Sequence, residues 1–377
     1  MNDFFVNFAV RTQRNKIIHI KKHVPPGGRV NVSVGHEVGP GDVIGEGQTQ
    51  IGFRTIHLAS VLGVGPKDAL ASLKPKMNQT IFQGELLAEV KGLLKLGKKV
   101  LVSPVDGVVD FIDPKTGDLR LKLIPKRIKL LSGVYGVIDG IGRDGDILIR
   151  TLADVIYGCL GSGREREGTL KVIGTAGDLI SSKQIVESAR GCIVVGGQLI
   201  FPEALKKAAA IQVLGLITGG INACDFKGMA GEVKTPVSGL SDVGISLMVT
   251  EGFGSIPIGE DIFSILKGHS GKYAVLNGNS SRLILPTGDE QSIIYIRKTR
   301  LPLNGSLDER PEKEAVLLKT GQTVRTIGGP KIGFMGVVES IDQAPSKLPS
   351  GITSFLVTVL GTKQKIRVPY QNLEVIG

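Results

Sequence analysis

The sequence predicts a mixed, multidomain protein in which two small β-rich domains flank an α/β domain. Its 377 residues exceed one ordinary core and suit two to four domains of roughly 100–200 residues. Glycine is the outlying residue, with 52 copies against a usual share of about 7%, and its scattered placement is typical of short strands and tight turns. Between residues 178 and 300 strands alternate with helices, which indicates a parallel sheet.

The charge balance is basic and the aromatic content is low. Lys and Arg number 46 against 35 Asp and Glu, which gives a net charge of +11. This excess favours a polyanion such as RNA as partner, and the alternative is a solvated basic surface without a dedicated partner. Aromatic residues make up 5% and Trp is absent, so we do not expect an aromatic groove for sugars or bases.

Cysteines and histidines give no sign of a metal site. The three cysteines lie far apart without a CxxC pair, which argues against a disulfide framework and a Cys₄ zinc site. His19 and His23 are four residues apart, but prolines follow at once and no helix signal surrounds them. We therefore expect no metal, no cofactor and no catalytic residue.

The chain also lacks the sequence features of export or membrane insertion. Its first residues have no basic start and cleavage site of a signal peptide, and no stretch reaches 18 apolar residues. We expect a cytoplasmic protein without a membrane span.

An internal echo marks the first domain, which we expect at residues 1–129. The segment 38–46 returns 43 residues later as 81–89, in the shared form apolar-x-x-Gly-acid-x-apolar-small-Glu. The glycine supplies the turn and the alternating apolar residues form the returning strand. A Ser-Pro-Val-Asp-Gly-Val-Val segment follows at 103–109.

Together these motifs resemble the barrel-sandwich hybrid fold of lipoyl and biotinyl domains. The resemblance covers about 90 residues, and it implies fold rather than chemistry. A loaded domain carries its lysine in a setting such as Asp-Lys-Ala, which Lys91, Lys95, Lys98 and Lys99 lack. We expect an unmodified module, with a helical insert at about 54–73.

The segment 130–300 should hold the α/β domain, with three layers. We expect helices at 181–189, 202–210 and 260–267, and strands at 192–197, 214–220, 245–250 and 273–277. Two more strands, at 282–286 and 292–297, should be antiparallel. The pattern is similar to swivelling β/β/α domains, including phosphohistidine domains. The phosphoryl-accepting histidine is absent from 219–222, so that activity does not carry over.

The strand ends of this domain are the candidate ligand site. Open parallel sheets bind ligands beyond the carboxyl ends of their strands, and three such ends here are rich in glycine. The alternative is ordinary turn chemistry. The candidate residues are Gly196, Gly197, Thr218, Gly219, Gly220, Glu251, Gly252 and Gly254.

After a polar linker at 301–313, residues 314–377 resemble a KOW motif in an SH3-like β-barrel. Gly336 stands at the central glycine position, between apolar strand segments. The resemblance implies contact with RNA, the ribosome or RNA polymerase, and the alternative is a solvated basic rim on a structural barrel. The candidate contacts are Arg325, Lys331, Lys363, Lys365 and Arg367.

The leading prediction is a non-enzymatic binding protein that contacts RNA, or a ribosome or RNA polymerase complex, through this C-terminal domain. The first alternative is a small-ligand-binding, peptide-binding or enzymatic α/β domain with its site at the glycine-rich strand ends. The second alternative is a scaffold that joins other proteins.

Overall fold

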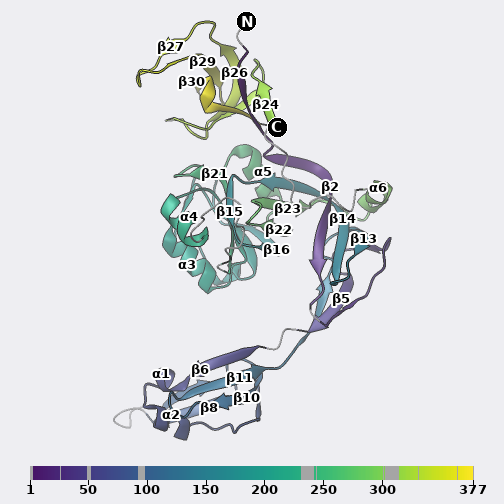
Figure 1. Cartoon of the computed structure of the whole chain (residues 1–377), viewed down its shortest axis with the longest axis vertical. Coiled ribbons are helices and arrows are strands. Elements are labelled where there is room, and N and C mark those ends of the chain that lie inside the picture. Colours follow the sequence, from purple (N-terminus) through teal and green to yellow (C-terminus); the bar gives the residue numbers. More distant parts are fainter. Residues whose placement is uncertain are drawn as a thin grey trace.

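The computed structural model describes residues 3–25, 27–48, 52–91, 98–230, 242, 244–299, 301, 314–329, 331–362 and 364–376. The chain is β-rich with short helices, and its strands form several sheets (Figure 1). Apart from Leu301, the expected linker at 301–313 lies outside the described residues. Among the described helices, none combines the length and apolar character that a membrane crossing requires.

The first and last parts of the chain form one sheet, here called the C-terminal body (5–9 and 314–376). Strand β1 (Phe5–Ala9) lies between β24 (Glu314–Leu317), antiparallel to it, and β31 (Leu373–Ile376), parallel to it. The expected domain of residues 1–129 is therefore wrong at its start, because residue 5 already belongs to another body.

The C-terminal body continues through strands that follow one another on the far side of β31. They are β25 (Thr323–Thr326), β26 (Met335–Ile341), β29 (Leu356–Leu360) and β30 (Lys365–Pro369). In the described residues this sheet is open, with β24 and β30 at its two edges, instead of the closed barrel that the sequence predicts.

The proximal unit (17–48 and 127–151) adjoins the α/β body. It is built from β2 (Thr12–His23), β3 (Arg29–Val30), β4 (Glu37–Val38), β5 (Val43–Gln48), β12 (Arg127–Leu131), β13 (Gly136–Ile141) and the first half of β14 (Asp146–Tyr157). Its core buries Ile20, Ile44, Ile138 and Ile149 completely or nearly so. The second half of β14 pairs with β23 (Arg282–Pro286) and so joins this unit to the neighbouring sheet.

The distal unit (52–124) occupies the place of a hairpin loop between β5 and β12. Gln48 of β5 pairs with Arg127 of β12, and the whole unit lies between these two residues in sequence. Its elements are β6 (Phe53–His57), α1 (Leu58–Leu62), α2 (Pro66–Ala71), β7 (Thr80–Ile81), β8 (Leu86–Lys91), β9 (Lys98–Val102), β10 (Gly107–Ile112) and β11 (Asp118–Leu123). A separate core fills it, and Figure 1 places it at the lower end of the molecule.

The proximal and distal units are two copies of one structure. Asp42 accepts a hydrogen bond from the backbone N–H of Gly39 at 2.7 Å, and Glu85 accepts one from Phe82 at 3.0 Å. In both units a serine hydroxyl also donates to the carbonyl two residues later, from Ser132 at 2.8 Å and from Ser103 at 2.6 Å. The echo thus marks two nested units, whereas the sequence interpretation placed both halves in one domain.

The strand pairings around these segments also repeat between the two units. His23 lies 2.8 Å from Asp146 across β2 and β14, and His57 lies 2.9 Å from Asp118 across β6 and β11. The pairing of β13 with β14 shifts register after Ile138, and that of β10 with β11 shifts after Val109. Because these strands and their irregularities coincide, each paired residue of β10 and β11 has a defined counterpart in β13 and β14.

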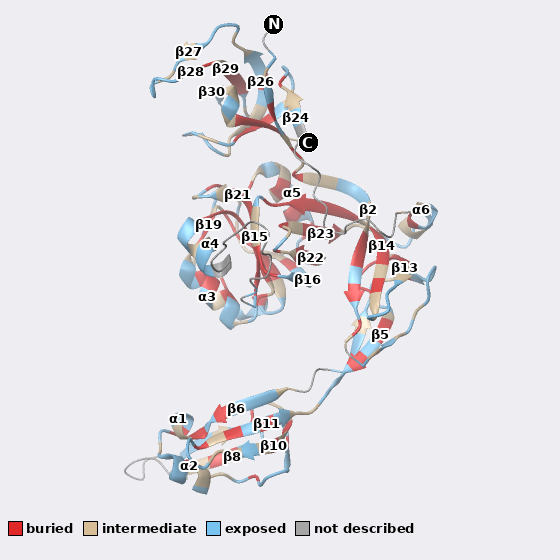
Figure 2. Ribbon diagram, viewed as in Figure 1, coloured by how far each residue is buried: buried red, intermediate tan, exposed pale blue. Residues whose placement is uncertain are grey.

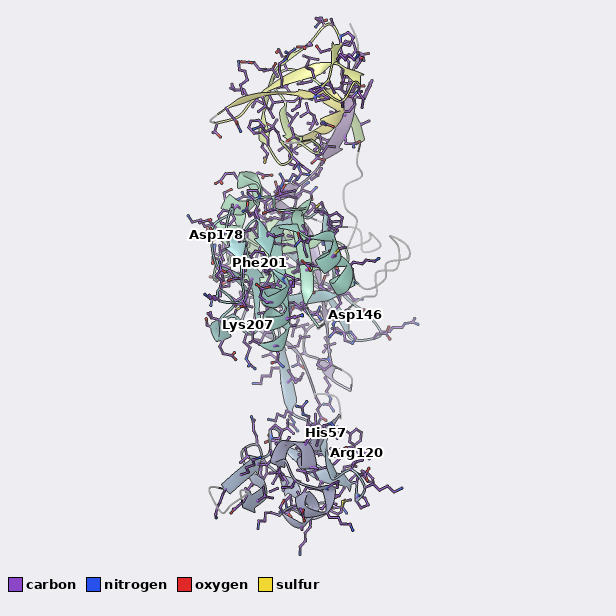
Figure 3. All side chains as sticks on the ribbon, turned by 90° about the vertical axis from the view of Figure 1, so that its left-hand side faces the viewer. His57, Arg120, Asp146, Asp178, Phe201 and Lys207 are labelled. Carbon is purple, nitrogen blue, oxygen red and sulfur yellow. The ribbon has the colours of Figure 1, made fainter. Side chains whose placement is uncertain are left out.

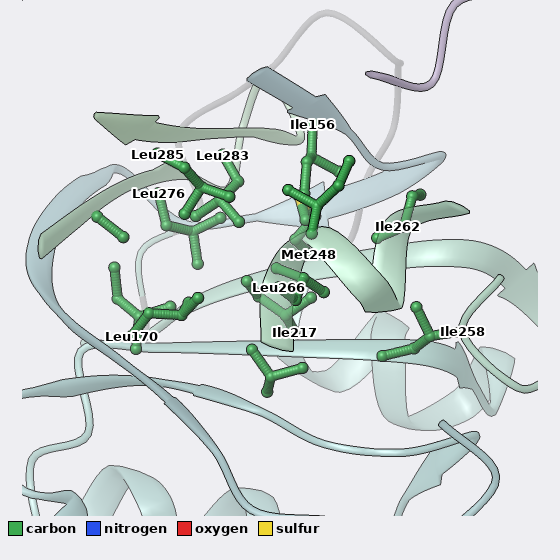
Figure 4. Close-up of a cluster of buried hydrophobic side chains, with 14 residues drawn as sticks. Ile156, Leu170, Ile217, Met248, Ile258, Ile262, Leu266, Leu276, Leu283 and Leu285 are labelled. Carbon is green, nitrogen blue, oxygen red and sulfur yellow. The ribbon is translucent and has the colours of Figure 1, made fainter. Parts of the chain in front are cut away.

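The α/β body (152–286) contains three of the four strands that the sequence predicts to run parallel, whereas the fourth, at 273–277, runs antiparallel to both of its neighbours. Strands β16 (Glu165–Val172), β18 (Cys192–Val195), β20 (Gly215–Ile221) and β21 (Ser246–Phe253) run parallel, and β22 (Tyr273–Asn277) and β23 (Arg282–Pro286) continue the sheet antiparallel. The expected helices at 202–210 and 260–267 are confirmed as α3 (Pro202–Ala210) and α5 (Glu260–Gly268). Their inner faces bury apolar side chains against the sheet, as Figure 4 shows for α5.

Two predicted elements are wrong. The segment 181–189 contains only a short 3₁₀ turn, η2 (Glu187–Ala189), in place of an α-helix. The expected strand at 292–297 is a helix, α6 (Ser292–Lys298). A further helix, α4 (Ala223–Ala230), follows β20.

Candidate functional site

The predicted RNA contacts do not gather on one surface. Arg325 lies on β25 and is buried, whereas Lys331 is exposed in the turn between β25 and β26. Lys365 and Arg367 lie two residues apart on the edge strand β30, where Lys365 pairs with Glu339 at 2.7 Å and Arg367 pairs with Asp342. Lys363 lies outside the described residues. The exposed basic positions of β30 are thus separate from Arg325.

The predicted ligand site is occupied by the protein's own backbone. A Cβ at Gly220 would lie 1.9 Å from the carbonyl oxygen of Gly254, and one at Gly219 would lie 2.1 Å from that of Ile256. A Cβ at Gly197 would lie 2.0 Å from the Asp178 carbonyl. These glycines let the chain cross the strand ends at close range, so the described strand ends offer no open crevice at these positions.

The remaining strand-end candidates also serve local structure. The Thr218 hydroxyl donates to the carbonyls of Gly197 at 3.0 Å and Gly220 at 3.1 Å. Gly252 and Gly254 have φ values of +130° and +109°, which a side chain at either position would strain. Gly196 packs on Ile180. Turn geometry therefore accounts for the glycine-rich ends.

Two residues predicted for different sites bind each other. Glu251 of β21 is buried. Its carboxylate forms one ion pair with Arg11, at 2.5 Å, and another with Arg325 of the C-terminal body. The backbone N–H of Gly259 also donates to Glu251, at 2.9 Å. The second partner of Arg325 is Glu374 on β31, at 2.5 Å. We call these four charged residues, Arg11, Glu251, Arg325 and Glu374, the interface network.

The electrostatics of the interface network favour the charged form of Arg325. Burial alone would lower the pKa of Arg325, but the carboxylates of Glu374 and Glu251 outweigh this effect and raise it. Asp261, 3.2 Å from Arg11, has a pKa raised by burial and partly restored by the Arg11 charge. Two guanidinium groups and two buried carboxylates thus neutralise one another where the C-terminal body meets the α/β body.

The turn after β25 strengthens the same contact. A Cβ at Gly333 would lie 2.8 Å from the Ile256 side chain, so this turn packs closely on the α/β body. The Arg11 guanidinium, on the segment between β1 and β2, also lies 3.5 Å from the sulfur of Met335. The hairpin of β25 and β26 therefore faces the neighbouring body along part of its length.

A hollow lies beside α5, away from these strand ends. Its volume is about 570 Å³, and Glu260 and Lys267 line it together with Thr175, Gly177 and Phe263. It carries a carboxylate and an ammonium group on one helix, without a paired nucleophile and base among its described lining residues. This arrangement does not support a catalytic assignment.

The distal unit has an exposed aromatic and basic face that the sequence did not predict. The Arg120 guanidinium lies over the rings of Phe53 and Phe111, at 5.0 and 5.3 Å from their centroids. Figure 3 shows Arg120 and His57 at the surface of this unit. The low overall aromatic content argued against such a surface, but pairing of β6, β11 and β10 brings two of the 12 Phe residues together. The alternating polar and apolar residues of β11 were the available signal.

Among the described residues, no group of three or more His, Cys, Asp or Glu side chains gathers in a metal-binding arrangement. A scan against protein-family models finds no match to this chain, and a search of curated proteins also finds none.

Proposed function

We propose that this chain is a non-enzymatic binding protein that acts as an adaptor, with the distal unit as its recognition module. The observation that carries this proposal is the position of the distal unit, which has its own core and replaces a hairpin loop between β5 and β12. Burial is confined to its interior, and its outer sheet face is exposed (Figure 2). At the other end, the interface network holds the C-terminal body against the α/β body.

Cross-linked capture of partners tests the adaptor function. The bait is the full chain, compared with a variant in which residues 49–126 are replaced by a two-residue Asn-Gly turn that joins Gln48 to Arg127. We expect proteins that are captured by the full chain, survive nuclease treatment and are lost with the variant. An identical set of captured proteins for both baits contradicts the adaptor function.

RNA contact through the C-terminal body is the second candidate. It is supported by Lys365 and Arg367, which lie side by side on the exposed edge strand β30, and by the net charge of +11. Both side chains are ion-paired on the surface, and such pairs are weak enough for phosphates to compete with their acidic partners.

The test measures affinity of the full chain for single-stranded RNA against salt. The double variant K365E/R367E should lose most of the affinity and flatten the salt dependence, whereas K206E/K267E on exposed positions of the α/β body should change both much less. Equal losses in both double variants would indicate non-specific charge attraction and reject this surface.

A further inference from the structure

Because the two units repeat one another, the exposed face of the distal unit can be compared with the same face of the proximal unit. Leu119 and Leu121 of β11 point into the core, so Arg120 and Lys122 between and beyond them point outward. The shared pairing register assigns outer residues of the distal sheet counterparts in the proximal unit. These pairs include Phe53 and His19, Val108 and Val137, Asp110 and Asp139, Phe111 and Gly140, and Lys122 and Arg150.

Helix α6 covers this face in the proximal unit. The helix packs against β13 and β14, and its Ile296 is completely buried. Val137 is 3% exposed and Arg150 is 6% exposed, and both lie outside the inner core cluster of this unit. Arg297 at the end of α6 pairs with Glu37 at 3.3 Å. A short helix that buries Ile296 and ends in charged residues therefore lies over the proximal face.

The same face of the distal unit is open. Phe53 is 55% exposed and Phe111 is 46% exposed, although the counterpart of Phe53, His19, is buried. No described helix of this chain packs on this face, because α1 and α2 direct Leu58, Leu62 and Ala69 into the inner core. Contiguous exposed apolar surface is typical of interaction sites, and aromatic side chains supply much of the binding energy at such sites.

The charges of the face define the partner further. Arg120 pairs with Asp110 at 2.7 Å, and His57 pairs with Asp118 at 2.9 Å. Lys122, between Phe53 and Val108 in the sheet, has no ion-pair partner among the described residues. The face therefore presents two aromatic rings and one uncompensated positive charge, which a carboxylate complements.

We propose that the outer face of β6, β11 and β10 binds an amphipathic α-helix of a partner protein, with apolar side chains on Phe53 and Phe111 and an Asp or Glu on Lys122. The partner helix takes the place that α6 takes on the proximal unit. This inference rests on the adaptor function and adds to it the binding surface and the chemistry of the ligand.

A displayed library of random peptides of about 16 residues, long enough for roughly four helical turns, provides the probe. It is selected on the full chain, and the enriched peptides are measured by fluorescence anisotropy. We expect apolar residues at i, i+3, i+4 and i+7 with an acidic residue on the same face, and helical circular dichroism on binding. The variant F53A/F111A should weaken binding about tenfold or more. F253A, a comparably exposed Phe of the α/β body, should leave it unchanged.

Charge reversal distinguishes this inference from simple hydrophobic attraction. K122E should weaken an acidic peptide and strengthen its Glu-to-Lys version. Enriched peptides without helical spacing, no enrichment at all, or binding that is unchanged in F53A/F111A would overturn the inference. The inference would also be overturned if F53A/F111A lost affinity for a single-stranded RNA and kept its affinity for the peptides. That result would identify a base-stacking surface. If F53A/F111A still captures the partners that depend on residues 49–126, the adaptor function survives and this surface is wrong.

Discussion

Glu251 shows how one residue can connect two predicted sites. The sequence placed Glu251 in a ligand crevice and Arg325 on an RNA surface, and the structure pairs the two side chains in a buried contact. Local patterns identified both residues as unusual, because a carboxylate at a buried strand end and an arginine within an apolar strand both require partners. They did not reveal that each provides the partner of the other, since 74 residues separate them.

Removing the shared carboxylate should destabilise the contact between the two bodies. Glu251→Ala leaves Arg11 and Arg325 buried with one partner fewer each, a change that typically costs about 3–5 kcal/mol. Chemical unfolding followed by fluorescence and scattering measures the loss. Glu339→Ala, which breaks the exposed pair with Lys365, is the matched control and should cost about 0–1 kcal/mol. Equal effects of the two changes would show that the interface network contributes no more than a surface pair.

Asp146 gives a pH-dependent prediction at the same scale. Hydrogen bonds from Lys21 and His23 hold its pKa below the ordinary value of 3.8, although burial opposes them. Its stabilising contribution is therefore complete above that pH and is lost as the pH falls through the lower folded-state value. The Tm difference between the natural chain and Asp146→Asn should be constant from about pH 5 to 7 and shrink below about pH 4. Asp144→Asn, at an exposed neighbouring position, serves as the control.

At the scale of elements, the sequence predicted correctly those helices and strands whose apolar pattern extends over several residues. Helices α3 and α5 were recovered because buried positions repeat along them at helical spacing. Strands β18, β20 and β21 were recovered because each is a continuous apolar run that is buried almost throughout. The prediction of a helix at 181–189 was wrong. The Gln184 side chain accepts from the N–H and hydroxyl of Ser181, and this local bonding produces a turn where a helix start was expected.

The prediction of a strand at 292–297 was also wrong, and there tertiary packing decided the structure. The sequence of α6, Ser-Ile-Ile-Tyr-Ile-Arg-Lys, is rich in residues that favour strands. Hydrogen bonds between Asp289 and Ser292, at 2.8 Å in both directions, start the helix, and burial of Ile296 against the proximal unit fixes it. Tertiary packing thus overrides the local preference, and no pattern within the segment contains that information.

Glycines of different elements should respond oppositely to an added methyl group. Gly220→Ala places a Cβ 1.9 Å from the Gly254 carbonyl oxygen, so backbone must move, at a cost of about 1–3 kcal/mol or more. Gly228→Ala lies within α4 with nothing within 4 Å of its Cβ and should stabilise by about 0.5–1 kcal/mol. Thermal unfolding of both variants measures the difference. Equal Tm values would contradict the close backbone crossing at the strand ends.

At the scale of the whole molecule, the echo was visible in the sequence but its meaning was not. Two similar segments 43 residues apart fit one domain with internal symmetry as well as two domains, one inserted in the other. The choice depends on which strands pair, and β5 pairs with β12 across the entire distal unit. The N-terminal strand was misplaced for the same reason, because its partners β24 and β31 lie more than 300 residues further along the chain.

The insertion predicts that the rest of the chain folds without the distal unit. Replacing residues 49–126 by an Asn-Gly turn closes β5 and β12 as an ordinary hairpin and leaves the core of the proximal unit intact. The variant should unfold within a few degrees of the corresponding transition of the full chain in calorimetry. A large loss of cooperativity would show that the distal unit stabilises the remainder and would contradict its independence.

The position of β1 has a consequence for synthesis. This strand leaves the ribosome well before its neighbours in the sheet, Glu314–Leu317 and Leu373–Ile376, which are translated much later. Until those residues emerge, the unpaired edges of β1 have no native strand to join, and such edges favour aggregation. The distal unit, in contrast, is complete once residue 124 emerges and can fold while the chain that carries it is still being made.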